Sequence, residues 1–400
     1  MQPMIASANS IELTGFRLVR DTPTGCANVC NVLESRRDPH RHFEKESAMV
    51  DRRRQRRRQG NSQDDSPAEW AKFVARQPRA HILQLMEWGM LKDCFDWDAY
   101  EFTVGDRDGM RASALTLVKD LPMRLGKMAY VPMGPYAEHE MVYDALWSDI
   151  GRETGAAFLK IEPGHLAPSE ELDLRNMGFR PSPQTIQPPR TIVIDIRSSQ
   201  DEILANMNQS TRRKIRKSLA SDLRVRTGKQ RDLRAFCQLM QETGDRNSFG
   251  VHSAAYYEMV FDLFMPRYGT LLLAELDGEL LAGLMVFALG GTAWYMYGAS
   301  TRAHNHVNAS YGLQWAAIRW AKDRRCHSYD MWGVPDHDEE TLEAQFRDRR
   351  DGLWGVYGFK RGWGGEVRRT LGAWDLPFSR PVYAAYRAAL RARKIGLFSP

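Results

Sequence analysis

The chain has 400 residues, of which 43% are hydrophobic and 26% charged, and its formal net charge is +6. This length is too great for one ordinary domain and suits two or three, and the composition is that of a globular protein. The longest apolar run, residues 280–289, is about half as long as a bilayer-spanning helix, so we expect a buried strand there.

The cysteines and the N-terminus exclude several other classes. The five cysteines are odd in number and show no CxxC spacing, so we expect neither a disulfide framework nor a zinc site. The first fifteen residues lack a basic start followed by an apolar core. We therefore expect no secretory signal and a cytoplasmic protein.

Residues 1–65 differ in composition from the rest of the chain. They contribute +3 of the net charge, and the other 335 residues contribute the remaining +3. RRRQRRR (52–58) precedes a polar stretch, and no helical or strand period runs through this region, so we predict a disordered basic tail. The basic run suits contact with RNA or with an anionic membrane surface, or it is simply solvated.

The first structured block is predicted to cover residues 66–188. Its hydrophobic periods predict helices over 68–77, within 81–95, over 140–155 and over 168–179, and strands over 100–106, 110–121, 127–135 and 157–163. The helix over 168–179 ends at a glycine, which is a common helix stop signal.

A proline-rich stretch, residues 180–190, is a linker candidate, and a second block follows it. We predict helices near 199–220, 231–246, 253–265, 308–324 and 339–358, and strands over 191–196, 269–276, 279–290, 292–300, 327–333 and 366–375. Both blocks place an antiparallel meander before a helix and a further strand. The order of elements predicts an α/β (α+β) class with two similar domains whose sheets are mixed and largely antiparallel.

The segment NMNQSTRRKIRKSLA (206–220) is strongly basic. Five cations fall within residues 212–217, and Ile215 and Leu219 supply a narrow apolar edge to a predicted helix. Such a density of like charge favours an anion-binding face, for which phosphate is the natural ligand. The alternative is a solvated basic face.

In GFKRGWGGE (358–366), two cations, Lys360 and Arg361, are followed by Trp363 and by three glycines at 362, 364 and 365. Side-chain cations and free backbone N–H groups in such a loop can bind an oxyanion or a phosphate. The pattern is equally that of a glycine turn between a helix and a strand.

YDMWGVPDHDEE (329–340) places Asp330 in a predicted strand and Asp336 just after it. Carboxylates at a strand end can orient an amine. Asp336 can equally cap the helix that follows.

Common catalytic motifs are missing from the sequence. It contains no GxSxG elbow, no GxxxxGK[ST] loop, no HExxH and no His/Cys cluster with metal-ligand spacing. Neither a covalent serine or cysteine mechanism nor a metal mechanism is favoured.

Four stretches together resemble the FemABX family of peptidoglycan bridge-forming aminoacyltransferases. They are residues 177–196, 206–218, 295–321 and 329–367, which span most of the second block in the family's order. The resemblance covers the chain from about residue 66 to its end. Trp363 and Gly358 depart from the residues usual in the family's FKxGFGG motif, which leaves the substrate preference open.

The resemblance implies two tandem domains of the GCN5-related N-acetyltransferase type, over 66–188 and 189–365, with residues 366–400 returning to the first. It implies transfer of an amino acid from aminoacyl-tRNA to the side-chain amine of the stem peptide in lipid II or UDP-MurNAc-pentapeptide, with no cofactor. Peripheral contact with the inner face of the membrane fits a lipid-linked acceptor. The coiled-coil arm of some members is missing, since only residues 241–253 join the helices at that place.

The resemblance also implies roles for particular residues. Lys360 matches the family's motif lysine and is expected near the scissile carbonyl, with Arg361 beside it, and Asp330 and Asp336 are expected to steer the attacking amine. The expected substrate-binding residues are Arg361, Lys92 for the acceptor diphosphate, Arg212 and Arg213 for phosphates of tRNA or of the acceptor, and Tyr297 and Tyr311 for the acceptor peptide. The two tyrosines are equally compatible with a role as core aromatic residues.

Two other functions remain open from the sequence. An acyl-CoA-dependent N-acyltransferase on the same fold would need a pyrophosphate loop, and NASYGLQ (308–314) has none at the equivalent helix start. A non-catalytic protein that binds RNA or the precursor would need only the basic tail and the basic cluster.

Overall fold

The computed structural model describes residues 67–391 apart from 107–108, 139–141, 165–173 and 248–249. The predicted basic tail therefore lies outside the described residues, as does the first half of the helix predicted over 168–179. In the described part of the chain, no helix combines the length and the apolar character that crossing a bilayer requires.

The first sheet carries a meander followed by a parallel strand. Its order is β1-β2-β3-β5-β14-β6, with β4 beside β2, and β3 and β5 form its parallel pair. Its strands are β1 (Asp98–Asp106), β2 (Gly109–Asp120), β3 (Lys127–Pro132), β4 (Tyr136–Ala137), β5 (Phe158–Glu162), β6 (Arg180–Pro181) and β14 (Trp374–Pro377). Its helices are α3 (Pro67–Arg76), α4 (Met86–Asp93), α5 (Tyr143–Thr154) and α13 (Arg380–Arg391).

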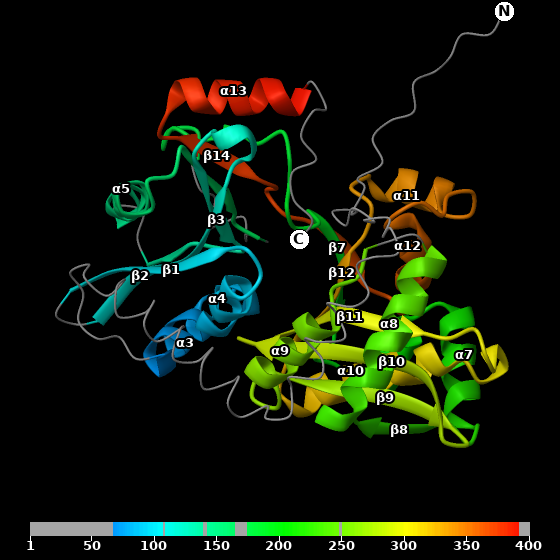
Figure 1. Cartoon of the computed structure of the whole chain (residues 1–400). Coiled ribbons are helices and arrows are strands. Elements are labelled where there is room, and N and C mark those ends of the chain that lie inside the picture. Colours follow the sequence, from blue (N-terminus) through cyan, green and yellow to red (C-terminus); the bar gives the residue numbers. More distant parts are fainter. Residues whose placement is uncertain (1–66, 107–108, 139–141, 165–173, 248–249, 392–400) are drawn as a thin grey trace, which may run out of the picture. The chain divides into compact units, whose positions relative to one another are not determined.

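The second sheet repeats this plan (Figure 1). Its order is β13-β7-β12-β11-β10-β9-β8, with β11 and β12 parallel. Its strands are β7 (Arg190–Asp195), β8 (Arg224–Thr227), β9 (Gly269–Leu276), β10 (Glu279–Leu289), β11 (Thr292–Ser300), β12 (Ser328–Gly333) and β13 (Glu366–Arg369). Its helices are α6 (Gln200–Asn206), α7 (Gln209–Leu219), α8 (Leu233–Asn247), α9 (Ala254–Phe264), α10 (Ala309–Asp323), α11 (Glu339–Gln345) and α12 (Trp354–Lys360).

The predicted fold class is confirmed. Each sheet contains an antiparallel meander and a strand parallel to the last strand of that meander, and a crossover helix (α5 or α10) connects the two parallel strands as in a βαβ unit. Only six residues separate α8 from α9, which leaves no room for a coiled-coil arm.

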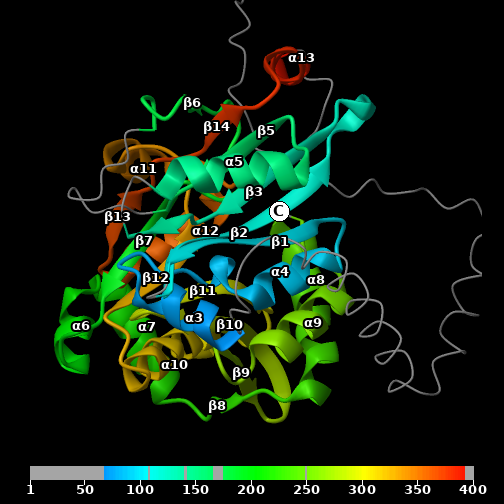
Figure 2. The ribbon, with the colours of Figure 1, turned by 90° about the vertical axis from the view of Figure 1, so that its left-hand side faces the viewer.

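Hydrophobic side chains form three layers around the two sheets. Figure 2 shows α5 and α4 on opposite sides of the first sheet, and neighbouring residues of β2 accordingly fall into different clusters. In the second sheet, α8 and α9 pack on one face and α10 on the other. The cluster that contains α4, α8 and α9 includes side chains of both sheets, so the two sheets share a central core.

Three element boundaries differ from the prediction. The helix predicted near 199–220 is two helices, because Asn208 caps α7 with a 2.8 Å hydrogen bond from the Thr211 N–H. The helix predicted over 339–358 is also two, α11 and α12. Residues 174–178, at the end of the helix predicted over 168–179, form a turn.

The strand predicted over 366–375 is wrong in a way that matters for the architecture. It is two short strands in different sheets: β13 pairs with β7, and β14 pairs with β5 and β6. The chain therefore joins the first sheet at Trp374 and not at residue 366. A period of two cannot distinguish one strand from two that are separated by a four-residue crossing.

Candidate functional site

The end of strand β12 is irregular where it passes β7. The register of the pair shifts between Asp330 and Gly333, and Trp332 has a left-handed backbone with a φ of 62°. A non-glycine residue in this conformation is strained and is held there by its surroundings. The irregularity directs the carbonyl oxygens of Trp332 and Gly333 toward the C-terminal residue of α12.

That residue is Lys360, and its side chain is only 7% exposed. The Nζ donates hydrogen bonds to the Gly333 carbonyl at 2.7 Å and to the Trp332 carbonyl at 3.2 Å. Burial lowers the pKa of Lys360 to about 7, and the negative charge of Asp330 opposes this shift. The predicted motif lysine is thus a buried group that titrates near neutral pH.

Asp330 is also buried and is fixed by neighbours that the sequence does not reveal. Its Oδ1 accepts a hydrogen bond from the Thr191 hydroxyl of β7 and one of 2.7 Å from the Trp332 N–H. The structure therefore places Asp330 close enough to Lys360 for its negative charge to act on the Lys360 ammonium group. Thr191 and Trp332 complete the arrangement, but a lone threonine and tryptophan give no sequence signal for it.

The three glycines after Lys360 are needed for packing within the protein. A Cβ on Gly362 would lie 2.4 Å from the Thr211 Oγ1, and one on Gly364 would lie 2.5 Å from the Asn206 carbonyl oxygen. Gly364 also has a φ of 74°. The loop thus lies directly on the junction of α6 and α7, where the Asn208 N–H donates to the Gly362 carbonyl at 3.0 Å.

The two arginines that were expected to bind phosphate have different surroundings. Arg212 donates to the Ala205 carbonyl at 2.9 Å and to the Met207 carbonyl, so it satisfies acceptors at the end of α6. Arg213 is exposed and lines a cavity of about 130 Å³. Only Arg213 is placed to meet a ligand.

The cavity beside α7 is basic. It is lined by Arg213, Lys214, Lys217, Asn305, His306 and Asn308, which come from α7 and from the turn before α10. Within the described residues, neither Arg213 nor Lys217 has an ion-pair partner. Three cations around one small cavity suit an anionic group such as a phosphate.

A chain of side chains connects this cavity with the Lys360 loop. Lys214 donates a 2.9 Å hydrogen bond to the Tyr311 hydroxyl and lies 4.6 Å from the centre of that ring. Tyr311 in turn stacks on Trp363, with ring centres 5.8 Å apart and planes at 14°. Tyr311 thus contacts both Lys214 of the basic cavity and Trp363 of the loop that follows Lys360.

Arg361 is not available as a second cation of the loop. Its guanidinium donates to Glu343 of α11 through Nε at 2.7 Å and through Nη2, and the Tyr357 hydroxyl donates to the same carboxylate at 2.8 Å. This pair lowers the pKa of Glu343. Glu343 lies 18 residues before Arg361 in the sequence, on a different helix, so only the folded chain brings the two side chains together.

Asp336 lies on the surface between strands. It accepts hydrogen bonds from Arg369 at 2.8 and 2.9 Å and from Arg190 at 3.3 Å, and these arginines lower its pKa. The alternative role as a helix cap is wrong, because Asp338 caps α11 through the Thr341 N–H.

Lys92 lies in the central core, away from the Lys360 group. It is 8% exposed, donates to the Tyr256 hydroxyl at 3.3 Å, and lies 4.8 Å from the centre of the Trp88 ring. Burial lowers the pKa of Lys92 to about 8, and the charge of Lys119 acts in the same direction. Aromatic side chains therefore enclose the amine that was expected to meet the acceptor diphosphate.

Tyr297 belongs to the group around Lys92. Its hydroxyl lies 3.2 Å from that of Tyr256, and His252 stacks on Tyr256 with ring centres 3.8 Å apart. Tyr295, two residues earlier on β11, lies instead under Lys360, with its ring centre 6.0 Å from Nζ. A bulge at Met296 sends the two tyrosines to opposite faces, which strict alternation would not predict.

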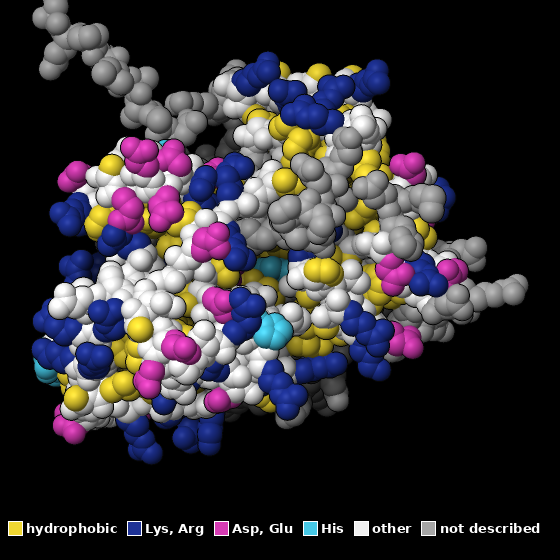
Figure 3. Space-filling view, turned by 180° about the vertical axis from the view of Figure 1, so that it is seen from behind, with side chains coloured by type: hydrophobic (Ala, Val, Ile, Leu, Met, Phe, Trp, Pro, Cys, Tyr) yellow, Lys and Arg dark blue, Asp and Glu magenta, His cyan; other side chains and the backbone are white. Residues whose placement is uncertain are grey.

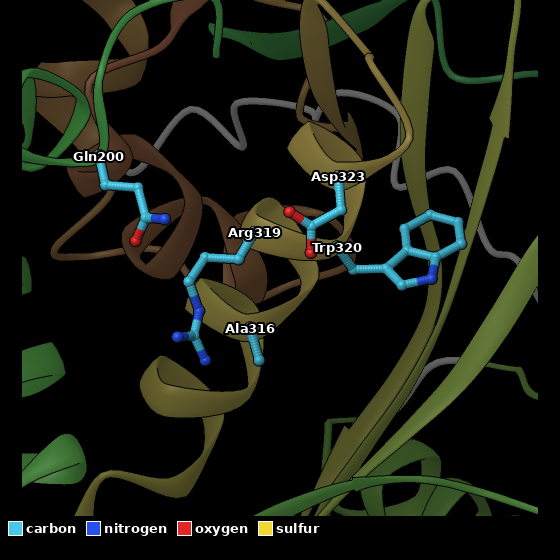
Figure 4. Close-up of a pocket in the computed structure, with 5 residues that line it drawn as sticks. All are labelled: Gln200, Ala316, Arg319, Trp320 and Asp323. Atoms are coloured by element: carbon cyan, nitrogen blue, oxygen red, sulfur yellow. The ribbon is translucent and has the colours of Figure 1, made fainter.

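The larger cavity of the second sheet's helices contains none of the predicted residues. It has a volume of about 350 Å³ and is lined by Gln200, Ala316, Arg319, Trp320 and Asp323. Figure 4 shows the side chains of Gln200 and Arg319 on one side, with the indole of Trp320 directed away from them. The cavity lies on the outer side of α10, and neither Lys360, Asp330 nor Lys92 lines it.

Solved structures of similar fold place the chain in a class. FemX has a TM-score of 0.72 and 21% identity, over 80% of this chain and 98% of that one. L-PGS from Bacillus licheniformis has a TM-score of 0.51 and 14% identity, over 84% and 99%. The two mixed sheets of this chain therefore have the fold of FemX.

The chain belongs to the FemAB family, whose model matches residues 65–178, 171–280 and 277–391. Among curated relatives, the lipid II:glycine glycyltransferase of Staphylococcus epidermidis is 22% identical over an alignment 391 positions long that covers 78% of this chain and 91% of that protein. The enzyme of the same name from Staphylococcus aureus is 23% identical over 397 residues, with the same coverage. These relatives are aminoacyltransferases.

Proposed function

We propose that this protein is an aminoacyltransferase that adds an amino acid to the stem peptide of a peptidoglycan precursor, with aminoacyl-tRNA as the donor. The observation that carries the proposal is the match to the FemAB family model from residue 65 to 391. It is supported by the similarity to lipid II:glycine glycyltransferases, of which the alignment covers 91%. The identity of the amino acid and the choice between a lipid-linked and a UDP-linked acceptor are left to experiment.

The reaction requires no protein nucleophile. The neutral amine of the stem peptide attacks the ester carbonyl of the donor, and a new C–N bond forms. The ester C–O bond then breaks, the amine gives up a proton, and the ribose hydroxyl of the tRNA takes one up. The protein has to position the two substrates and stabilise the oxyanion that develops on the carbonyl.

Lys360 is the proposed oxyanion-stabilising group. In its protonated form it is a buried cation beside the β12 carbonyls, where low polarity strengthens its field. Asp330 favours this protonated form electrostatically. Because Asp330 is itself fixed by Thr191 and Trp332, its proposed role is to position and charge Lys360, and through it to help orient the amine.

The basic cavity beside α7 is the proposed phosphate site for one of the two substrates. Arg213 and Lys217 provide charge that no described acidic group neutralises, and Tyr311 connects the cavity to the loop of Lys360. Tyr297 and Lys92 belong to the central core and are covered by other side chains. We propose that they contact the acceptor only after substrate binding has moved these covering side chains apart.

A transfer assay tests the proposal. Purified protein is incubated with total charged tRNA and either UDP-MurNAc-pentapeptide or lipid II, and the acceptor is analysed by mass spectrometry. We expect a mass increase of one aminoacyl unit that ribonuclease abolishes, and the mass names the amino acid. No increase with either acceptor, together with transfer from an acyl-CoA, would assign the protein to a different acyltransferase activity.

A further inference from the structure

The outer face of helix α13 is basic. The helix carries three arginines, Arg380, Arg387 and Arg391, and no acidic residue. The sequence from residue 376 to 400 contains five cations and no aspartate or glutamate. In the described part of the chain, none of the three arginines takes part in an ion pair.

The opposite face of α13 is firmly attached to the first sheet. Tyr383 and Tyr386 are buried and pack on Phe158, with ring centres 5.3 and 4.7 Å apart. The Tyr383 hydroxyl donates to Asp375 at 2.9 Å, and Asp375 accepts a 2.8 Å hydrogen bond from the buried Lys160. This network fixes which face of the helix points to solvent.

Apart from Pro381, the exposed residues of α13 are arginines and alanines. Arg380, Arg391, Ala384, Ala385 and Ala388 are exposed, and Arg387 is half-buried over the Tyr383 ring. Figure 3 shows dark blue side chains with yellow ones between them along the upper edge of the molecule, where α13 lies. The exposed positions of α13 are therefore cationic and carry no large apolar side chain, and the exposed Phe378 lies two residues before the helix.

We propose that the arginine face of α13 is a docking surface for an anionic membrane. An array of arginines on one rigid face suits a surface of lipid phosphates, because each cation gains energy from the negative surface potential without needing a shaped pocket. Alanines allow the backbone to approach the headgroups closely. If the acceptor of the proposed reaction is lipid-linked, this contact brings the enzyme to the surface that holds it.

Vesicle sedimentation tests the docking surface without any substrate. The full-length protein is mixed with vesicles of phosphatidylcholine alone, or with vesicles that also contain roughly 30–40% phosphatidylglycerol and therefore have a negative surface potential. We expect binding only to the anionic vesicles, a loss of binding at high salt, and a decrease of roughly 10²-fold in the partition coefficient for R380Q/R387Q/R391Q.

Two matched variants make the result decisive. R52Q/R53Q/R54Q removes the same charge from the basic tail, and we expect it to change the partition coefficient less than the α13 variant does. R380K/R387K/R391K keeps the charge and should bind like the wild type, which separates charge from folding. Unchanged binding of the glutamine variant of α13, or loss of binding only in the tail variant, would overturn the proposal.

The same variants distinguish this proposal from the proposed reaction. With UDP-MurNAc-pentapeptide in solution, the α13 variant should transfer at the wild-type rate, whereas transfer to lipid II in anionic vesicles should decrease. If vesicle binding depends on α13 while no transfer occurs with any acceptor, the membrane surface stands and the proposed function fails. If the α13 variant loses affinity for tRNA and keeps its affinity for vesicles, the face binds RNA and the membrane proposal is wrong.

Discussion

At the scale of single residues, burial controls what the cations of this protein can do. Lys360 and Lys92 are enclosed and have lowered pKa values, whereas Arg361 and Arg212 are occupied by protein acceptors. A cation that is already neutralised offers little to a ligand, so sequence alone overstates the number of available charges. Lys360 is the residue whose surroundings best fit a catalytic task.

We expect K360A to lower kcat by roughly 10²-fold, the effect of losing one group that stabilises an oxyanion. K322A is the matched control, because Lys322 also donates to backbone carbonyls, those of Ile196 and Ser198. Steady-state transfer rates measure both. An unchanged kcat in K360A, or an equal decrease in K322A, would exclude a special role for Lys360.

The buried lysines also predict how stability depends on pH. Lys360 has a pKa of about 7 in the folded protein and about 10.5 when unfolded, so between these values the unfolded chain binds more protons. The free energy of unfolding should therefore rise with pH from about 7 upward, by at most about 1.4 kcal/mol per pH unit for one such group. Lys92 acts in the same direction from pH 8.

Urea unfolding at pH 7 and pH 9 of the wild type and of K360M measures this contribution. K360M should be more stable than the wild type at pH 7, and the difference should shrink by pH 9. Parallel pH profiles for the two proteins would show that Lys360 does not titrate in this range.

At the scale of secondary structure elements, the loop after α12 and the junction between α6 and α7 form one unit. Gly362 and Gly364 allow the loop to lie on Asn206 and Thr211, and the Asn208 N–H bonds to the loop. The position of the basic helix α7 and the position of Lys360 therefore depend on each other. The small residues of the glycine-rich loop thus permit close contact with the junction of α6 and α7.

G364A should destabilise the protein by more than about 2 kcal/mol, since it combines a left-handed backbone with a Cβ 2.5 Å from a carbonyl oxygen. The control in the same motif is G358A, where a Cβ would meet only Phe346 at 3.7 Å. Because Gly358 lies within α12, G358A should be neutral or stabilising by about 0.5–1 kcal/mol. Denaturant titration measures both, and equal effects would contradict the packing role.

The basic cavity on α7 predicts a salt-dependent effect. R213Q/K217Q should weaken binding of the phosphate-bearing substrate and reduce the slope of log K against log salt by about 1 to 2. R216Q is the control, because Arg216 is exposed on the same helix and does not line the cavity. Filter binding with charged tRNA, and calorimetry with the UDP-linked acceptor, would identify the substrate; an unchanged slope with both would show a solvated face.

At the scale of the whole molecule, the two sheets are not independent. One hydrophobic cluster joins helices α4, α8 and α9 to both sheets, and the described residues lie in one compact unit. The group of Lys92, Tyr256 and Tyr297 lies in this shared layer. Any substrate that reaches Lys92 has to separate side chains from both halves.

We expect the two sheets to unfold together. M285A removes a fully buried side chain from β10 in the shared layer and should cost about 2–5 kcal/mol. Hydrogen exchange should then show a similar loss of protection in β3 of the first sheet as in β10. A loss confined to the second sheet would show that the halves unfold separately.

Much of the fold follows from local patterns in the sequence. Alternation and helical periods give the meanders, the crossover helices and the repeated order, because these depend on neighbours within a few residues. The breaks in the helices predicted near 199–220 and over 339–358 did not follow from them. At the first break the Asn208 N–H donates to the carbonyl of the distant Gly362, and across the second break Arg361, after α12, pairs with Glu343 of α11.

The site was predictable in part. Lys360 and Asp330 stand in recognisable motifs, and the structure brings them together. Thr191, Trp332 and Glu343 carry no local signal, because their roles arise where β7, β12 and α11 meet. The bulge at Met296, which separates Tyr295 from Tyr297, is likewise invisible to alternation.

The sequence by itself determined the α/β class, the family and the chemical types at the site, because composition, periodicity and motif order are properties of the chain alone. Only the tertiary structure decided which cations are available: Arg213 and Lys217 line a cavity, Arg212 and Arg361 are bound by the protein, and Lys92 is enclosed by aromatic rings. The physical reason is that the partner of each charge lies on another element, and burial by that partner fixes whether the charge can reach a ligand.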